Sequence, residues 1–106
     1  MIISGGENIY STQVEAAIHQ HPAVLESAVF GVPDDTWGEA VKAVVVLKPG
    51  QQATEEEIIA EASQHLASYQ KPKSVDFVEA LPKAPTGKIL KRELRDPYWQ
   101  EETRQV

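Results

Sequence analysis

ESAVFGV at residues 26–32 and VKAVVVL at residues 41–47 are the two apolar runs around which the rest of the chain is arranged. Valine and other β-branched residues favour extended backbone, so both runs predict strands. The segment 33–38 between them holds a proline, two aspartates and a glycine, which are turn-forming residues. We therefore expect the two strands to pair as a hairpin joined by a long loop.

Helix signals flank this hairpin on both sides. Thr12 followed by Glu15, and Thr54 followed by Glu57, each match the capping box that marks the start of a helix. The first helix should end near His21, before a proline. Ile58 and other apolar residues at helical spacing give the second helix a core-facing side.

Three shorter elements complete the predicted order. Residues 2–3 and 8–10 predict a short N-terminal hairpin around a glycine turn, and residues 74–78 predict a third strand. Residues 89–95 predict a short last helix, and residues 96–106 a frayed tail. The predicted fold is α+β: a small domain with a central three-stranded, mainly antiparallel sheet flanked by helices, plus the N-terminal hairpin.

Length and composition predict one domain spanning residues 1–106, because 106 residues suffice for a single core. The chain has no cysteine, which favours a reducing, cytoplasmic location. Its longest apolar run, Ala43–Leu47, is too short for a transmembrane segment. Two of its histidines, His19 and His21, are spaced poorly for sharing a helix face, so no metal site is expected.

Charge is spread unevenly along the chain. The net charge is −6, yet residues 71–95 hold seven basic and three acidic side chains. An acidic protein is a poor general nucleic-acid binder, and this segment has only Phe77 for stacking on bases. We therefore expect no nucleic-acid partner. The basic segment is either an edge that faces an anion or a solvated basic helix.

The stretch PKAPTGKI at residues 82–89 places one lysine, Lys88, on a stiffened loop before this basic helix. Its prolines hold the approach extended, and Gly87 permits a tight turn. Such a loop can present one cation at a defined point, as a reaction that builds negative charge on a phosphate requires. Lys88 is not a P-loop lysine, because that motif needs glycine at the position of Pro82 and serine or threonine at that of Ile89.

A second glycine loop, SGGENIY at residues 4–10, precedes PKAPTGKI by about eighty residues of mixed α/β sequence. The two loops at this spacing, with smaller matches such as Val14-Glu15 and Tyr69 followed by Pro72-Lys73, resemble the C-terminal subdomain of the adenylate-forming superfamily. This superfamily comprises acyl-CoA synthetases, peptide-synthetase adenylation domains and luciferases. The versions SGGEN and TGKILKR are most similar to those of fatty-acyl-CoA and related acyl-CoA ligases.

The resemblance implies a role for individual residues. Lys88 matches the catalytic lysine that reaches the acyl carboxylate and the α-phosphate during adenylation. Ser4, Gly5, Gly6 and Glu7 match the cofactor-binding loop that lines the pantetheine tunnel after a large domain rotation. The family often has lysine directly after the tyrosine at Tyr69, where this chain has Gln70 and then Lys71. Lys71 is therefore either a contact for a CoA phosphate or a solvated surface lysine.

The resemblance also implies what this chain needs from elsewhere. The full reaction uses ATP, CoA, Mg²⁺ and a small-molecule carboxylate, and most of the ATP and acyl pocket belongs to a large N-terminal adenylation domain. We expect the 106-residue chain to be inactive alone and its uncovered face to favour self-association. Trp37 and Trp99 are candidates for such contacts, with packing inside the domain as the alternative for Trp37. An alternative is a free-standing interaction module that docks on a separate adenylating domain and supplies Lys88 in trans.

Overall fold

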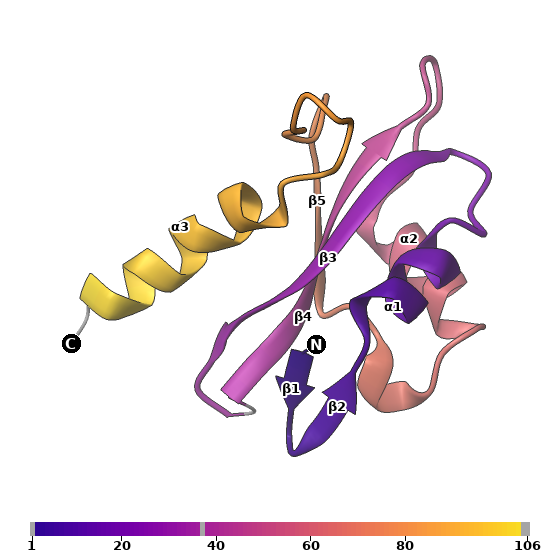
Figure 1. The fold of residues 1–106 in the computed structure, drawn as a ribbon. Helices are drawn as coiled ribbons and strands as arrows, with labels where there is room; N and C mark the ends of the chain where they lie inside the picture. The colour runs from indigo at the N-terminus through magenta and orange to yellow at the C-terminus, as the bar shows by residue number, and fades with distance from the viewer. Residues whose placement is uncertain (1, 37, 105–106) are drawn as a thin grey trace.

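The computed structural model describes residues 2–36 and 38–104, the last five of these by their backbone alone. Along the chain (Figure 1) the elements are β1 (Ile2–Ser4), β2 (Glu7–Ile9), α1 (Ser11–Ile18), β3 (Val24–Asp34), β4 (Gly38–Leu47), α2 (Glu55–Ser63), a 3₁₀ turn (Ser68–Gln70), β5 (Ser74–Phe77) and α3 (Lys91–Arg104).

The central sheet has three strands in the order β3-β4-β5, and β1 and β2 form a separate two-stranded hairpin. Strands β3 and β4 pair antiparallel, from Val24 opposite Leu47 to Asp34 opposite Gly38. Strand β5 pairs parallel to β4, because the connection through α2 returns the chain to the end at which β4 begins. The structure confirms the predicted α+β fold, with a mixed sheet and an N-terminal hairpin.

The predicted long loop between the first two sheet strands is wrong. Strand β3 continues through Pro33 and Asp34, and β4 begins at Gly38, so the connection is short. Proline is tolerated there because β3 lies at the edge of the sheet. Asp34 closes the turn by accepting the backbone N–H of Thr36 at 2.9 Å. Trp37, predicted as an interface candidate, lies outside the described residues.

Of the two predicted capping boxes, one is confirmed and one is wrong. In α2 the Thr54 hydroxyl accepts the Glu57 N–H at 3.2 Å, and Glu57 accepts the Thr54 N–H at 3.3 Å. Helix α1 begins one residue earlier than predicted, and its N-cap, Tyr10, makes no side-chain cap. Glu15 is used elsewhere, because its carboxylate accepts the backbone N–H of Val29 at 2.8 Å.

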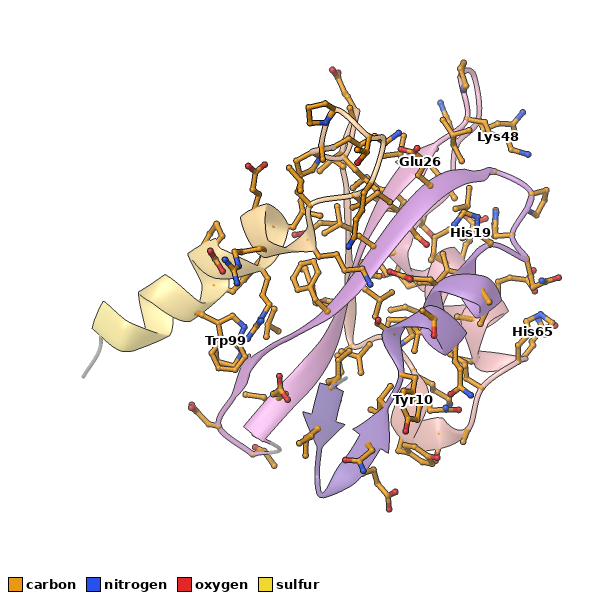
Figure 2. All side chains as sticks on the ribbon, viewed as in Figure 1. Tyr10, His19, Glu26, Lys48, His65 and Trp99 are labelled. Carbon is orange, nitrogen blue, oxygen red and sulfur yellow. The ribbon has the colours of Figure 1, made fainter. Side chains whose placement is uncertain are left out.

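The last helix is longer than predicted. It spans Lys91–Arg104 with Pro97 inside it, so the part of the predicted tail up to Arg104 belongs to α3. A proline inside a helix removes one backbone hydrogen bond, which favours termination. Two aromatic contacts with the sheet favour continuation: the Tyr98 hydroxyl donates to Asp76 at 3.0 Å, and the Trp99 indole N–H donates to the Gly31 carbonyl at 3.0 Å. Figure 2 shows Trp99 between α3 and β3.

Both faces of the sheet are covered, which explains why the two valine-rich runs lack polar alternation. Helices α1 and α2 lie on one side and α3 on the other (Figure 1). The larger cluster, on the α1–α2 side, includes Ile9, Val14, Ile18, Val29, Val41, Val45, Ile58 and Val75. The smaller cluster, on the α3 side, includes Ala28, Phe30, Val44, Val46 and Leu81, with Leu94 and Tyr98 packed against it.

A charged cluster fastens α3 to the sheet. Lys42 on β4 is 8% exposed and pairs with Asp76 on β5 at 3.0 Å. Its ammonium also lies 5.6 Å from the centre of the Tyr98 ring. The Lys42 hydrogen bond, opposed by burial, holds the pKa of Asp76 below its ordinary value. Burial, followed by the bond to Asp76, raises the pKa of Tyr98.

These shifts predict a stability plateau between acid and alkaline limits. Because the pKa of Asp76 is lowered on folding, its contribution is present above the unfolded value of about 3.9 and is lost as the pH falls through the folded value. Because the pKa of Tyr98 is raised, its contribution is present below the unfolded value of about 10 and is lost at higher pH. Asp76→Asn should lower the free energy of unfolding at pH 7 by about 1–2 kcal/mol, since half of the Asp76 side chain is solvent-screened.

Urea unfolding at pH 7, 5 and 3 would measure this effect. The difference in the free energy of unfolding between the wild type and Asp76→Asn should narrow as the pH falls, because protonation then removes the charge of the wild-type carboxylate. Asp35→Asn, at an exposed turn position, is the matched control. A gap that stays constant through the acid range would contradict the assignment to Asp76.

Candidate functional site

The segment carrying Lys88 folds as a small closed loop. Lys83 and Ile89 form an antiparallel bridge, and the Leu90 N–H donates to the Pro82 carbonyl at 2.8 Å. Inside it, the Ala84 N–H donates to the Lys88 carbonyl, also at 2.8 Å. Gly87 at the turn has a φ of +88°, which residues with a side chain rarely adopt. The backbone of Lys88 is therefore fixed by hydrogen bonds within the loop.

The side chain of Lys88, by contrast, projects into solvent. The residue is exposed, and its ammonium contacts no carboxylate or other acceptor in the part of the chain that the structure describes. Leu81, buried before the loop, and Ile89, packed against the same cluster, hold its two ends on the sheet. Lys83 pairs with Glu26 on β3 and adds a polar attachment. A rigid loop thus presents one unpaired cation.

The other predicted loop is the two-residue turn of the β1–β2 hairpin. Gly5 and Gly6 have φ values of +58° and +84°, and Ser4 pairs with Glu7 across the turn. Positive φ at both central residues is typical of a type I′ hairpin turn, and glycine adopts it without strain. No heavy atom lies within 4 Å of the position where a Cβ on Gly6 would stand, so the tip of the turn is open.

A pocket of about 370 Å³ opens beside this turn. Its lining residues come from the hairpin and from the segment around the 3₁₀ turn: Ser4, Gly5, Glu7, Ser68, Tyr69, Lys71, Pro72 and Lys73. Gln70 fastens the 3₁₀ turn to α1 by donating to the Gln13 side chain at 3.0 Å. The pocket therefore has one glycine wall and one wall that carries lysines and an exposed tyrosine.

The structure brings together four of the predicted site residues and separates a fifth from them. Ser4, Gly5, Glu7 and Lys71 line one pocket, although more than sixty residues separate Lys71 from the glycine turn. Gly6 lies at the tip of the turn and is not among the lining residues. The loop of Lys88 follows the C-terminal end of β5 and lies at the end of the central sheet away from the glycine turn (Figure 1).

Four pocket residues were missed as site residues: Ser68, Tyr69, Pro72 and Lys73. Tyr69, Pro72 and Lys73 could have been found by their match to the family pattern, whereas Ser68 carries no such signal. Two further features concern the described residues as a whole. Within residues 2–36 and 38–104, no group of three or more metal-ligating side chains occurs. No helix in this range is long and apolar enough to cross a membrane.

Comparison with known proteins places these features in a family. Residues 13–88 match the family described as the AMP-binding enzyme C-terminal domain. The chain is 48% identical over 98 residues to the long-chain-fatty-acid–CoA ligase FadD13 of Mycobacterium tuberculosis, covering 92% of this chain and 19% of that protein. It is 42% identical over 105 residues to the fatty acid–[acyl-carrier-protein] ligase ScoC of Streptomyces coeruleorubidus, covering 99% of this chain and 20% of that protein.

Solved structures agree with the sequence comparisons. Apo MatB from Rhodopseudomonas palustris superimposes with a TM-score of 0.86 at 42% identity, over 91% of this chain and 19% of that one. A fatty acyl CoA synthetase of Mycobacterium tuberculosis gives a TM-score of 0.86 at 48% identity, over 92% of this chain and 19% of that one. The chain belongs to the AMP-binding enzyme C-terminal domain family. It spans about a fifth of the length of the curated relatives it matches.

Proposed function

We propose that this chain is the mobile C-terminal domain of an ATP- and CoA-dependent ligase that activates a small-molecule carboxylate. The observation that carries the proposal is the separation of the two loops. The loop that carries Lys88 and the Gly5-Gly6 turn lie near opposite ends of the central sheet (Figure 1), so they cannot both reach a single reaction centre in one orientation of the domain. Two orientations would let each loop serve one of two successive steps.

In the first step, Lys88 acts as the catalytic cation. A carboxylate oxygen attacks the α-phosphorus of ATP, the bond from that phosphorus to the bridging oxygen breaks, and pyrophosphate leaves. A Mg²⁺ ion, when bound, would offset part of the charge of the phosphates. Two anions approach each other, and charge spreads over the phosphoryl oxygens. An unpaired ammonium on a rigid loop offsets both effects without first breaking an ion pair of its own.

In the second step, the glycine turn and its pocket accept the pantetheine arm of CoA. The CoA thiol gives its proton to solvent, the resulting thiolate sulfur attacks the acyl carbon, and the bond from that carbon to the AMP oxygen breaks, so that AMP leaves. A turn without side chains lets the backbone approach a thin ligand closely, and an open space lies beside the tip. Lys71 would contact a phosphate of CoA, and its exposed position at the other wall of the pocket supports this role.

Movement between the two steps requires a large partner domain. A rigid rotation about a hinge would present Lys88 in one pose and the glycine turn in the other. The ATP and acyl pockets would belong mainly to the large N-terminal adenylation domain. We therefore infer that this chain forms no acyl-adenylate by itself.

A domain exchange tests the proposal. The C-terminal part of FadD13 that matches this chain is replaced by residues 1–106, and acyl-CoA formation is compared with that of FadD13 lacking its C-terminal part. We expect the chimera to form thioester and the isolated 106-residue chain to give no ATP–pyrophosphate exchange. A folded chimera that is no more active than the truncated ligase would overturn the proposal. Activity restored by adding the chain as a separate polypeptide would favour the interaction module that acts in trans.

A further inference from the structure

We propose that Lys91, held by Glu15, is a positioning residue that sets the place of Lys88 during adenylation. The inference rests on the function proposed above. Lys91 is the first residue of α3 and follows Lys88 by three positions. The two lysines differ in their surroundings: Lys88 has no partner among the described residues, whereas Lys91 contacts two side chains of α1.

The contacts of Lys91 join three elements. Its ammonium lies 2.7 Å from the Glu15 carboxylate and 3.1 Å from the Ser11 hydroxyl, both on α1. The same carboxylate accepts the backbone N–H of Val29 on β3 at 2.8 Å. The start of α3 is therefore tied to α1 and, through Glu15, to the edge strand of the sheet.

This ion pair is more protected than an ordinary surface pair. The Lys91 and Glu15 side chains are 35% and 18% exposed, and each has a second partner. Partial burial strengthens the attraction between the charges, and the added hydrogen bonds fix the geometry. The pair between Glu61 on α2 and His65, two residues beyond the end of that helix, is more exposed, at 26% and 43%. Neither of its side chains has a second partner in the described part of the chain.

The position of this pair gives it a role in catalysis rather than in stability alone. The Lys88 loop is closed by its own hydrogen bonds and leads directly into α3. A shift or rotation at the start of α3 would therefore move the whole loop, and Lys88 with it. Positioning matters at this point, because a misplacement of about 1 Å can cost on the order of 100-fold in rate.

The experiment uses the FadD13 chimera that contains the full 106-residue chain. Lys91→Met removes the cation, and Glu15→Gln removes the charge but keeps an oxygen that can accept the Val29 N–H. Each should slow acyl-adenylate formation by roughly 10- to 100-fold, measured as pyrophosphate release in a single turnover. Lys91→Arg should recover most of this loss. Thioester formation from synthetic acyl-adenylate and CoA should keep its rate.

Matched controls separate positioning from general effects of charge. Lys48→Met removes an exposed lysine elsewhere, and Glu61→Gln breaks the pair between Glu61 and His65. Neither should change either half-reaction. If Lys91→Met unfolds the domain, Glu15→Gln tests the positioning role instead, because glutamine keeps the shape of the glutamate side chain.

The deciding measurement is made in the Lys88→Ala background. Because Lys91 acts through Lys88, Lys91→Met should add no further loss once Lys88 is absent. Losses that multiply, or equal losses in both half-reactions, would overturn the inference. A normal adenylation rate for Lys88→Ala alone would instead overturn the proposed function, so the two failures are distinguishable.

Discussion

Replacing Lys88 by alanine in the chimeric ligase is expected to slow acyl-adenylate formation by roughly 100- to 1000-fold, the usual cost of losing one preorganised group that stabilises charge in the transition state. The side chain is exposed and unpaired among the described residues, so its removal leaves no buried charge behind. The loop should keep its shape, because its closing hydrogen bonds are between backbone atoms. Single-turnover release of pyrophosphate measures the effect.

The thioester step provides the internal control for this prediction. With synthetic acyl-adenylate and CoA supplied, Lys88→Ala should convert them at the unmodified rate, because the proposed second pose presents the Gly5-Gly6 turn instead. Lys48→Ala, an exposed lysine on another part of the surface, should affect neither step. Equal slowing of both steps would show that Lys88 does not belong to adenylation alone.

The extent of the sheet shows how far local patterns predict this fold. The two valine-rich runs were correctly predicted as strands, because β-branched side chains favour extended backbone wherever they occur. Their length was underestimated, since Pro33 and Asp34 are ordinarily turn residues. Pro33 stays in β3 because that strand lies at the edge of the sheet, a fact that no local pattern contains.

The two capping-box motifs also show that a local pattern does not contain the tertiary context. Thr54 and Glu57 form the predicted capping box, whereas Glu15, in the same arrangement with Thr12, does not. Glu15 instead accepts the Val29 N–H and pairs with Lys91, whose ammonium is brought within reach by tertiary packing. A local motif thus predicts the helix but not the partner of its acidic residue.

In the candidate site, too, local sequence predicted one part and tertiary packing determined the other. The positions of both loops, at residues 4–10 and 82–89, were predicted from their glycines and prolines, because the backbone preferences of these residues are local. The pocket beside the glycine turn needs Tyr69 and Lys73 as well, and these reach it only once the 3₁₀ turn is fastened to α1. Residue types therefore predicted where each loop lies, and packing determined what stands beside it.

The hairpin that carries the glycine turn should depend on its buried isoleucines and not on its exposed one. Ile9 at the end of β2 is 0% exposed and belongs to the larger core cluster, whereas Ile3 on β1 is 49% exposed. Ile9→Ala should lower the free energy of unfolding of the chain by about 2–5 kcal/mol, because it removes buried methyl groups and leaves a cavity. This is a large share of the roughly 5–15 kcal/mol that holds a typical domain together.

Ile3→Ala deletes the same atoms from the same hairpin and is the matched control. It should cost less than about 1 kcal/mol, as surface substitutions usually do. Urea unfolding of both variants measures the difference. Because β1 and β2 alternate their side chains between core and solvent, equal losses would mean that the hairpin pairs in another register. In that register Ser4 and Glu7 would no longer face each other across the turn, and the pocket beside it would lose its glycine wall.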